Sequence, residues 1–145
     1  MPHGRVQAYY RREHGDRPVL LRSSSDVDAL IDALLVSPPS ENMAALHSLE
    51  RSLMPAGVPD HELLVGADGD LQVGVLAFMD DGNFVSLDPS SKRRDEVSYS
   101  IMGNATEFLG NSEIDIALVR RAVKEFLSAG GRRPEVVQWQ EPEYW

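Results

Sequence analysis

The chain has 145 residues, a length that suits one domain able to bury a sizeable core without disulfides or structural metals. It contains no cysteine, which excludes disulfide bonds and all thiolate chemistry, and no run approaches the ~18 apolar residues that a membrane-spanning helix needs. Its formal net charge of −9 disfavours nucleic acid and anionic membranes as partners, because phosphate binding needs clustered Lys and Arg.

The charge is unevenly distributed along the chain. Residues 23–91 carry a net charge of −11, whereas residues 1–22 carry +3 and residues 92–145 carry −1. Such an acidic segment would attract a basic partner and speed its encounter, but excess acid also serves solubility alone. The sequence leaves both interpretations open. No apolar signal-peptide core follows Met1, so we expect a soluble, cytoplasmic protein.

The first predicted elements are a hairpin and a helix. Residues 5–12 alternate polar and apolar side chains, and residues 18–21 return as a second strand after the turn residues 13–16. Ser25 is expected to cap a helix that Pro38-Pro39 ends. The apolar side chains of this helix recur at helical spacing and form one stripe: Val27, Leu30, Ile31, Leu34 and Leu35.

A run of short strands follows. Apolar segments at 43–49, 61–67, 71–79 and 84–87 are separated by turns rich in Asp, Gly and Pro, which indicates antiparallel hairpins. Alternation predicts a further strand over 97–101. The segment 103–112 is expected to be a loop.

The chain ends with a second helix and a last strand. Asp115 is the expected cap, Val119, Val123 and Phe126 share one face, and Gly130 suits the left-handed position that ends a helix. Val137 and Trp139 lie on one side of the last strand. The order of elements predicts a single α+β domain, residues 1–145, in which two helices pack on one face of a curved, mainly antiparallel sheet.

The sequence contains no catalytic, metal or cofactor signature. His61-Glu62 begins like a zinc-protease motif, but Val65 stands where the second histidine ligand is needed. Asp68-Gly69-Asp70 is not a calcium loop, because Val73 and Met79 occupy the positions of its essential Gly and Glu. We therefore expect no metal, no cofactor and no turnover.

The residues best suited to contact a partner are acids at hairpin turns and aromatic rings at the chain end. Tyr144 and Trp145 either fold back onto the sheet, which we favour, or anchor a partner. The acidic candidates are Asp68, Asp70, Asp80, Asp81 and Asp88.

Segments spread along most of the chain carry a family resemblance. They are Tyr9-Tyr10, His14-Gly15-Asp16, residues 26–32, residues 58–63, Arg94-Asp95-Glu96-Val97, Met102-Gly103, residues 122–127 and Val137-Gln138-Trp139. Together they resemble the Imm1 family of bacterial immunity proteins, in its actinobacterial type. The chain departs from the family pattern at residues 87–92, which are less aromatic, and at Ser98-Tyr99-Ser100, where the family is richer in tyrosine.

The resemblance implies a small α+β protein encoded beside a secreted polymorphic toxin, which it binds and neutralises. Many such toxins act on nucleic acids and need basic substrate channels, which the acidic middle segment would cover without catalysis. Two alternatives remain open. One is a small-ligand-binding or hydrolytic domain with a pocket formed by His47, Tyr99 and Glu62, and the other is a structural or regulatory module for an unrelated host protein.

Overall fold

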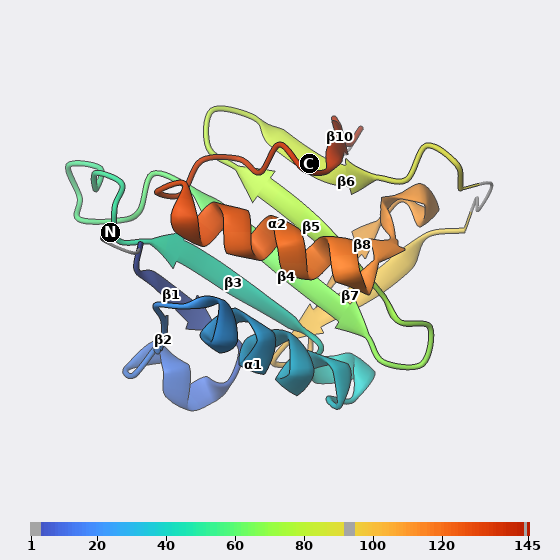
Figure 1. Ribbon diagram of the computed structural model, residues 1–145, viewed down its shortest axis with the longest axis horizontal. Coiled ribbons are helices and arrows are strands. Elements are labelled where there is room, and N and C mark those ends of the chain that lie inside the picture. The colour runs from blue at the N-terminus through green and yellow to red at the C-terminus, as the bar shows by residue number, and fades with distance from the viewer. Residues whose placement is uncertain (1–3, 92–94, 144) are drawn as a thin grey trace.

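The large sheet carries both helices on one face and a short hairpin on the other (Figure 1). The computed structural model describes residues 4–91, 95–143 and 145. Within them, eight strands form the large sheet in the order β10-β6-β5-β4-β3-β1-β2, with β9 paired to β5, and all pairs are antiparallel. These strands are β1 (Val6–Tyr9), β2 (Val19–Leu21), β3 (Met43–Ser48), β4 (Glu62–Asp68), β5 (Val73–Met79), β6 (Asn83–Leu87), β9 (Ile114–Asp115) and β10 (Gln138–Gln140).

Helix α1 (Ser24–Leu35) begins two residues earlier than the sequence predicts. Ser23, and not Ser25, is the cap: its side chain accepts a hydrogen bond from the Asp26 N–H (3.2 Å). The Asp26 carboxylate accepts in return from the Arg22 N–H (2.8 Å). Ser23 and Ser25 each have an acid three residues later; Asp26 bonds the backbone ahead of Ser23, whereas Asp28 is held by Arg120 and Lys124.

Helix α2 (Ile116–Ser128) begins and ends as predicted. The Asp115 side chain accepts from the Ala117 N–H (3.1 Å) at its start. At its end Gly130 adopts φ +70°, and the Gly131 N–H donates to the Phe126 carbonyl (3.0 Å). This is a Schellman ending, which needs a residue in the left-handed conformation.

The main core lies between the two helices and the sheet, which confirms the predicted α+β fold with both helices on one face. The sheet contributes alternate residues of its central strands, because alternate side chains of a strand point to the same face. The helices contribute the predicted residues Val27, Leu30, Ile31 and Leu34 from α1 and Val119, Val123, Phe126 and Leu127 from α2, together with Ala122.

Ion pairs join the two helices above this core. Arg120 contacts both Asp28 (2.9 Å) and Asp32 (2.6 Å), and Lys124 contacts Asp28 (3.0 Å). Hydrogen bonds from Lys124 and Arg120 hold the pKa of Asp28 below its usual value, although partial burial acts in the opposite direction. Asp28 and Asp32 are therefore matched by bases of the neighbouring helix.

The opposite face is covered in part by a two-stranded sheet of β7 (Val97–Ile101) and β8 (Asn104–Phe108). The prediction that residues 103–112 form a loop is therefore wrong. Met102 (φ 50°) and Gly103 (φ 81°) form the two-residue turn, and both adopt the positive φ of a type I′ hairpin. The strand was not evident because only Phe108 of β8 is buried, so apolar alternation is absent.

A second, smaller core lies under this hairpin and depends on one glycine. A Cβ placed on Gly66 of β4 would lie 2.6 Å from the Tyr99 ring, so the absence of a side chain lets Tyr99 lie directly on the sheet. Tyr99 in turn packs edge-on against Phe108, with ring centroids 5.9 Å apart. The other members of this core are Met43, Leu64, Val75, Ala77 and Val85.

Candidate functional site

The five candidate aspartates fall at opposite ends of the sheet. Asp68 ends β4, Asp70 lies in the β4–β5 turn, and Asp88 follows β6. Because β4 and β6 both run antiparallel to β5, these three lie at one end. Asp80 and Asp81 lie in the β5–β6 turn, at the other end. The sequence placed all five on hairpin turns, but the structure does not bring them into one site.

The end with Asp80 and Asp81 carries mixed charge. Arg51 lies 3.7 Å from the Asp80 carboxylate and 3.0 Å from that of Asp60. Arg133 lines the same shallow cavity as Asp80 and Asp81 and stacks on Phe84, 3.9 Å from the ring centroid. These guanidinium groups partly neutralise the acids beside them.

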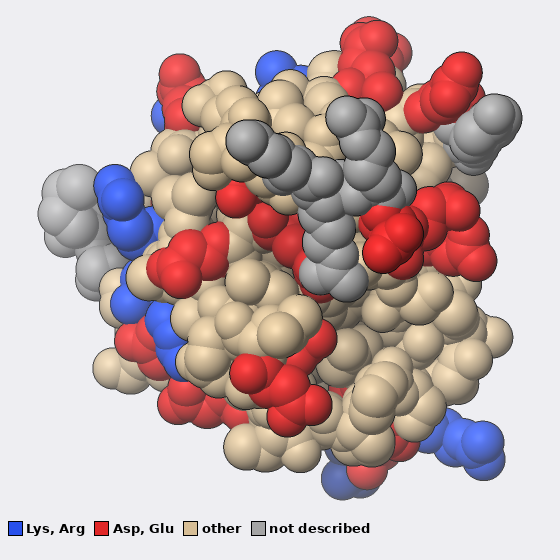
Figure 2. Space-filling view, turned by 90° about the vertical axis from the view of Figure 1, so that its right-hand side faces the viewer, with Lys and Arg blue, Asp and Glu red and all other residues tan. Residues whose placement is uncertain are grey.

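The end with Asp68, Asp70 and Asp88 is more uniformly acidic. Asp68 accepts hydrogen bonds from the backbone of its own turn, and Asp88 accepts from Ser90. In the described residues none of the three carboxylates forms an ion pair with Lys, Arg or His. Figure 2 shows the side of the molecule where β4 and β6 end, with Asp and Glu scattered across it and Lys and Arg towards its edges.

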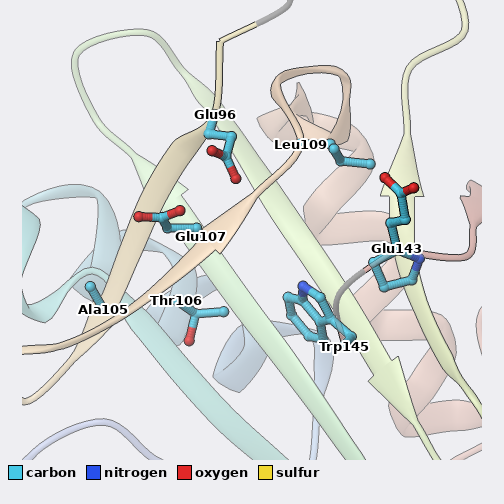
Figure 3. Close-up of a pocket in the computed structure, with 8 residues that line it drawn as sticks. Glu96, Ala105, Thr106, Glu107, Leu109, Glu143 and Trp145 are labelled. Atoms are coloured by element: carbon cyan, nitrogen blue, oxygen red, sulfur yellow. The ribbon is translucent and has the colours of Figure 1, made fainter.

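Near this end a groove runs between β8 and the C-terminal segment. Figure 3 shows two glutamates of the hairpin, Glu96 and Glu107, on one side of it, and Glu143 and Trp145 on the other. The groove has a volume of about 480 Å³, and the remaining lining residues are Ala105, Thr106, Leu109 and Pro142. It combines three carboxylates with an apolar wall.

Trp145 lies back against the hairpin, as we favoured. Its ring centroid is 5.3 Å from that of Phe108, and 38% of the residue remains exposed to solvent. The ring is therefore fixed on one side and accessible on the other. Tyr144 lies outside the described residues.

Sequence reasoning did not single out Glu96, Glu107 and Glu143. All three belong to residues 92–145, whose net charge is only −1 because bases elsewhere in the segment balance the acids. Glu107 also lies in the segment that was predicted to be a loop. Recognition of the Met102-Gly103 turn would have paired Glu107 with Ser98, two residues from Glu96 and on the same side of the facing strand.

The pocket proposed for a ligand-binding or hydrolytic domain is not formed. The His47 ring and the Glu62 carboxylate do lie together (3.1 Å). Tyr99 does not join them, because its hydroxyl donates to the Glu113 carboxylate (2.7 Å) beneath the hairpin. The cavity beside His47 is lined instead by residues of β1, β3 and the 49–59 segment.

Asp60 and His61 have the arrangement of an acid–histidine pair, yet the histidine is not available as a base. Its Nδ1–H donates to Asp60 (2.9 Å), while its Nε2 accepts the Ser48 N–H (2.8 Å). Burial lowers the pKa of His61 despite the hydrogen bond to Asp60. Both ring nitrogens are thus engaged in holding β3 to the start of β4.

Neither a metal cluster nor a membrane-spanning helix is present in the part of the chain that the structure describes. No group of three or more His, Asp or Glu side chains there is arranged to hold a metal ion. None of the helices described is long and apolar enough to cross a membrane.

The sequence matches the model of one known protein family. No curated protein matches the chain. The family model of immunity protein Imm1 matches residues 15–141, which include both helices and the groove residues Glu96 and Glu107. The chain therefore belongs to the Imm1 family of immunity proteins, and this membership implies a toxin-neutralising role with a toxin as its partner.

Proposed function

We propose that this protein neutralises its cognate secreted toxin without catalysis, by binding over the toxin's active site. The observation that carries the proposal is the Imm1 match over residues 15–141. Masking requires only a complementary surface. Of the two acid–histidine pairs described above, Asp60 and His61 are fully engaged in structural hydrogen bonds, and Tyr99 does not join His47 and Glu62.

The toxin that fits this surface has a basic active site, such as one that binds nucleic acid. A nucleic-acid substrate channel needs clustered Lys and Arg. Asp68, Asp70 and Asp88 offer carboxylates without a described cation beside them. We therefore expect them to steer the encounter more strongly than Asp80 and Asp81, which Arg51 and Arg133 partly neutralise.

The test is inhibition of the toxin domain encoded by the adjacent gene. The purified protein should abolish toxin activity at a 1:1 ratio, and added substrate should compete with it. Inhibition that substrate does not affect would contradict masking. Consumption or modification of the toxin by catalytic amounts of the protein would contradict a non-enzymatic mechanism.

Charge variants test the surface. Asp68→Lys/Asp70→Lys should slow association by on the order of tenfold at low salt, with a smaller effect at high salt, because distant charges are screened. Glu13→Lys/Asp16→Lys reverses two exposed acids in the β1–β2 connection, changes the net charge by the same amount and serves as the control. Equal effects of the two double variants would show that only net charge matters and that this end has no special role.

A further inference from the structure

One edge of β8 has backbone groups that no other described strand bonds. Ile101 and Asn104 flank the two-residue turn and form the first hydrogen-bonded pair, so Tyr99–Thr106 and Val97–Phe108 are the next bonded pairs. The backbone N–H and C=O groups of Ala105 and Glu107 then point away from β7. In the described residues no backbone or side-chain hydrogen bond uses these groups, and β8 pairs with β7 alone.

The other edge of the hairpin shows that this alternation holds. Ser100 pairs with Ala105, so its N–H should also point outward, and it donates to the Asn42 side chain (3.0 Å). In the turn, the Gly103 N–H donates to the Ser40 carbonyl (2.8 Å). The β7 edge is therefore covered by other residues of the chain at Ser100, whereas no described residue bonds the outward groups of Ala105 and Glu107 on the β8 edge.

The open edge faces the groove. Ala105, Thr106 and Glu107 line it directly, and Trp145 forms the opposite wall (Figure 3). Glu96, Glu107 and Glu143 surround the space, and no described Lys, Arg or His forms an ion pair with any of them. In contrast, Asp28 and Asp32 of α1 are paired with Arg120 and Lys124.

We propose that this groove binds an extended basic segment of the toxin, which adds as a third strand beside β8 and places an arginine or lysine side chain between Trp145 and the glutamates. The proposal rests on the proposed function for the identity of the partner. Strand addition supplies affinity through the backbone groups of Ala105 and Glu107. The side-chain chemistry follows from charge complementarity, because a cation is stabilised both by carboxylates and by the face of an indole ring.

The size of the groove sets the length of the segment. Ala105 to Glu107 span three residues of β8, and a paired strand advances about 3.3 Å per residue, so three to five residues of the partner fit along this edge. Side chains alternate across a strand, so one basic residue in two would face the same side of the groove. A segment alternating arginine with a small residue meets both conditions.

The first experiment uses the full chain and a capped pentapeptide that alternates alanine and arginine. In amide NMR spectra, binding should shift the Ala105 and Glu107 signals, slow their hydrogen exchange, and shift the indole N–H of Trp145. The same peptide with N-methylated backbone keeps its charge but cannot add as a strand, and should bind on the order of tenfold more weakly. Equal binding of both peptides would overturn strand addition.

Charge variants test the cation site in the same assay. Glu107→Gln/Glu143→Gln should weaken the arginine peptide on the order of tenfold, while the control Glu13→Gln/Asp16→Asn should not. An unchanged affinity in the groove variant would overturn the proposal. So would concentration-dependent dimerisation that protects the same two amides, because the occupant would then be a second copy of this chain.

Measurements on the toxin complex distinguish a failure of the groove proposal from a failure of the proposed function. If the chain inhibits the toxin and Glu107→Gln/Glu143→Gln leaves the dissociation rate unchanged, the groove proposal fails and the immunity function stands. If the arginine peptide binds as expected but the toxin is not inhibited, the immunity function fails and the groove remains a basic-peptide site. Slower hydrogen exchange at Ala105 and Glu107 in the toxin complex supports both.

Discussion

The two faces of the large sheet differ in the size of the core that they bury and in the pairing of their acidic side chains. The helix face has one continuous core, and the acids above it, Asp28 and Asp32, are paired with bases of α2. The hairpin face has a smaller core, an open strand edge and a groove whose glutamates have no described ionic partner. The comparison indicates that the helix face supplies stability, whereas the hairpin face retains unpaired groups that a partner can use.

Truncation of core side chains should have the largest effect and tests whether the helix face supplies most of the stability. Phe126→Ala removes a fully buried ring from the helix face and should lower the free energy of unfolding by about 3–5 kcal/mol, with Leu30→Ala costing about 2–5 kcal/mol. Phe108→Ala on the hairpin face should cost less than Phe126→Ala, because Trp145 lies beside Phe108 and can shift into the space. Urea denaturation of the three variants measures this. A larger loss at Phe108 would reverse the assignment of stability to the helix face.

The sequence predicted one face far better than the other. Apolar residues at helical spacing, such as Leu30 and Phe126, and the Gly130 ending identified both helices, because periodicity and capping are local properties. Only the first strand of the hairpin was predicted. The second strand was not, because Ala105, Thr106 and Glu107 do not alternate between apolar and polar side chains. The groove was missed entirely. Glu96, Glu107 and Glu143 are brought together by β7–β8 pairing and by the return of the chain end, neither of which is a local property.

Gly66 tests how closely the hairpin lies on the sheet. Gly66→Ala places a methyl group 2.6 Å from the Tyr99 ring, so either the hairpin shifts or the core is strained, and we expect a loss of about 1–3 kcal/mol. Gly15→Ala is the control, because nothing lies within 4 Å of a Cβ there. Thermal denaturation and the Tyr99 ring NMR signals report the two effects. A Gly66→Ala protein as stable as wild type, with unshifted Tyr99 signals, would contradict this packing.

Acid should weaken the sheet through two histidines. His14 accepts the backbone N–H groups of Tyr10 and Arg11 with Nδ1, and His61 accepts that of Ser48 with Nε2. Burial lowers the pKa of both rings, so their neutral forms are favoured in the folded state. The stability that depends on neutral rings is fully present above about pH 7 and decreases as the pH falls through the unfolded value of about 6.5.

The measurement is the urea midpoint between about pH 7.5 and pH 5.5, a window in which carboxylates remain ionised. The midpoint should fall on acidification in the wild type. His14→Asn/His61→Gln should flatten the slope, because an amide oxygen can accept the same N–H groups without titrating. An equally steep slope in the double variant would assign the effect to other groups.

The smallest expected change in stability comes from removing single acidic charges. It compares a paired acid of the helix face with an acid of the groove. Asp28→Asn removes the shared partner of Arg120 and Lys124; because these groups are partly exposed, the expected loss is only about 0.3–1 kcal/mol and should shrink in high salt. Glu107→Gln removes an acid that has no described cation beside it and lies near other acids, so the free energy of unfolding should stay within about 0.5 kcal/mol or rise. Urea denaturation at low and high salt shows whether each variant lowers or raises the free energy of unfolding. If Glu107→Gln destabilised the protein as much as Asp28→Asn, the groove acids would be structural, and the argument that they are kept for a partner would lose its basis.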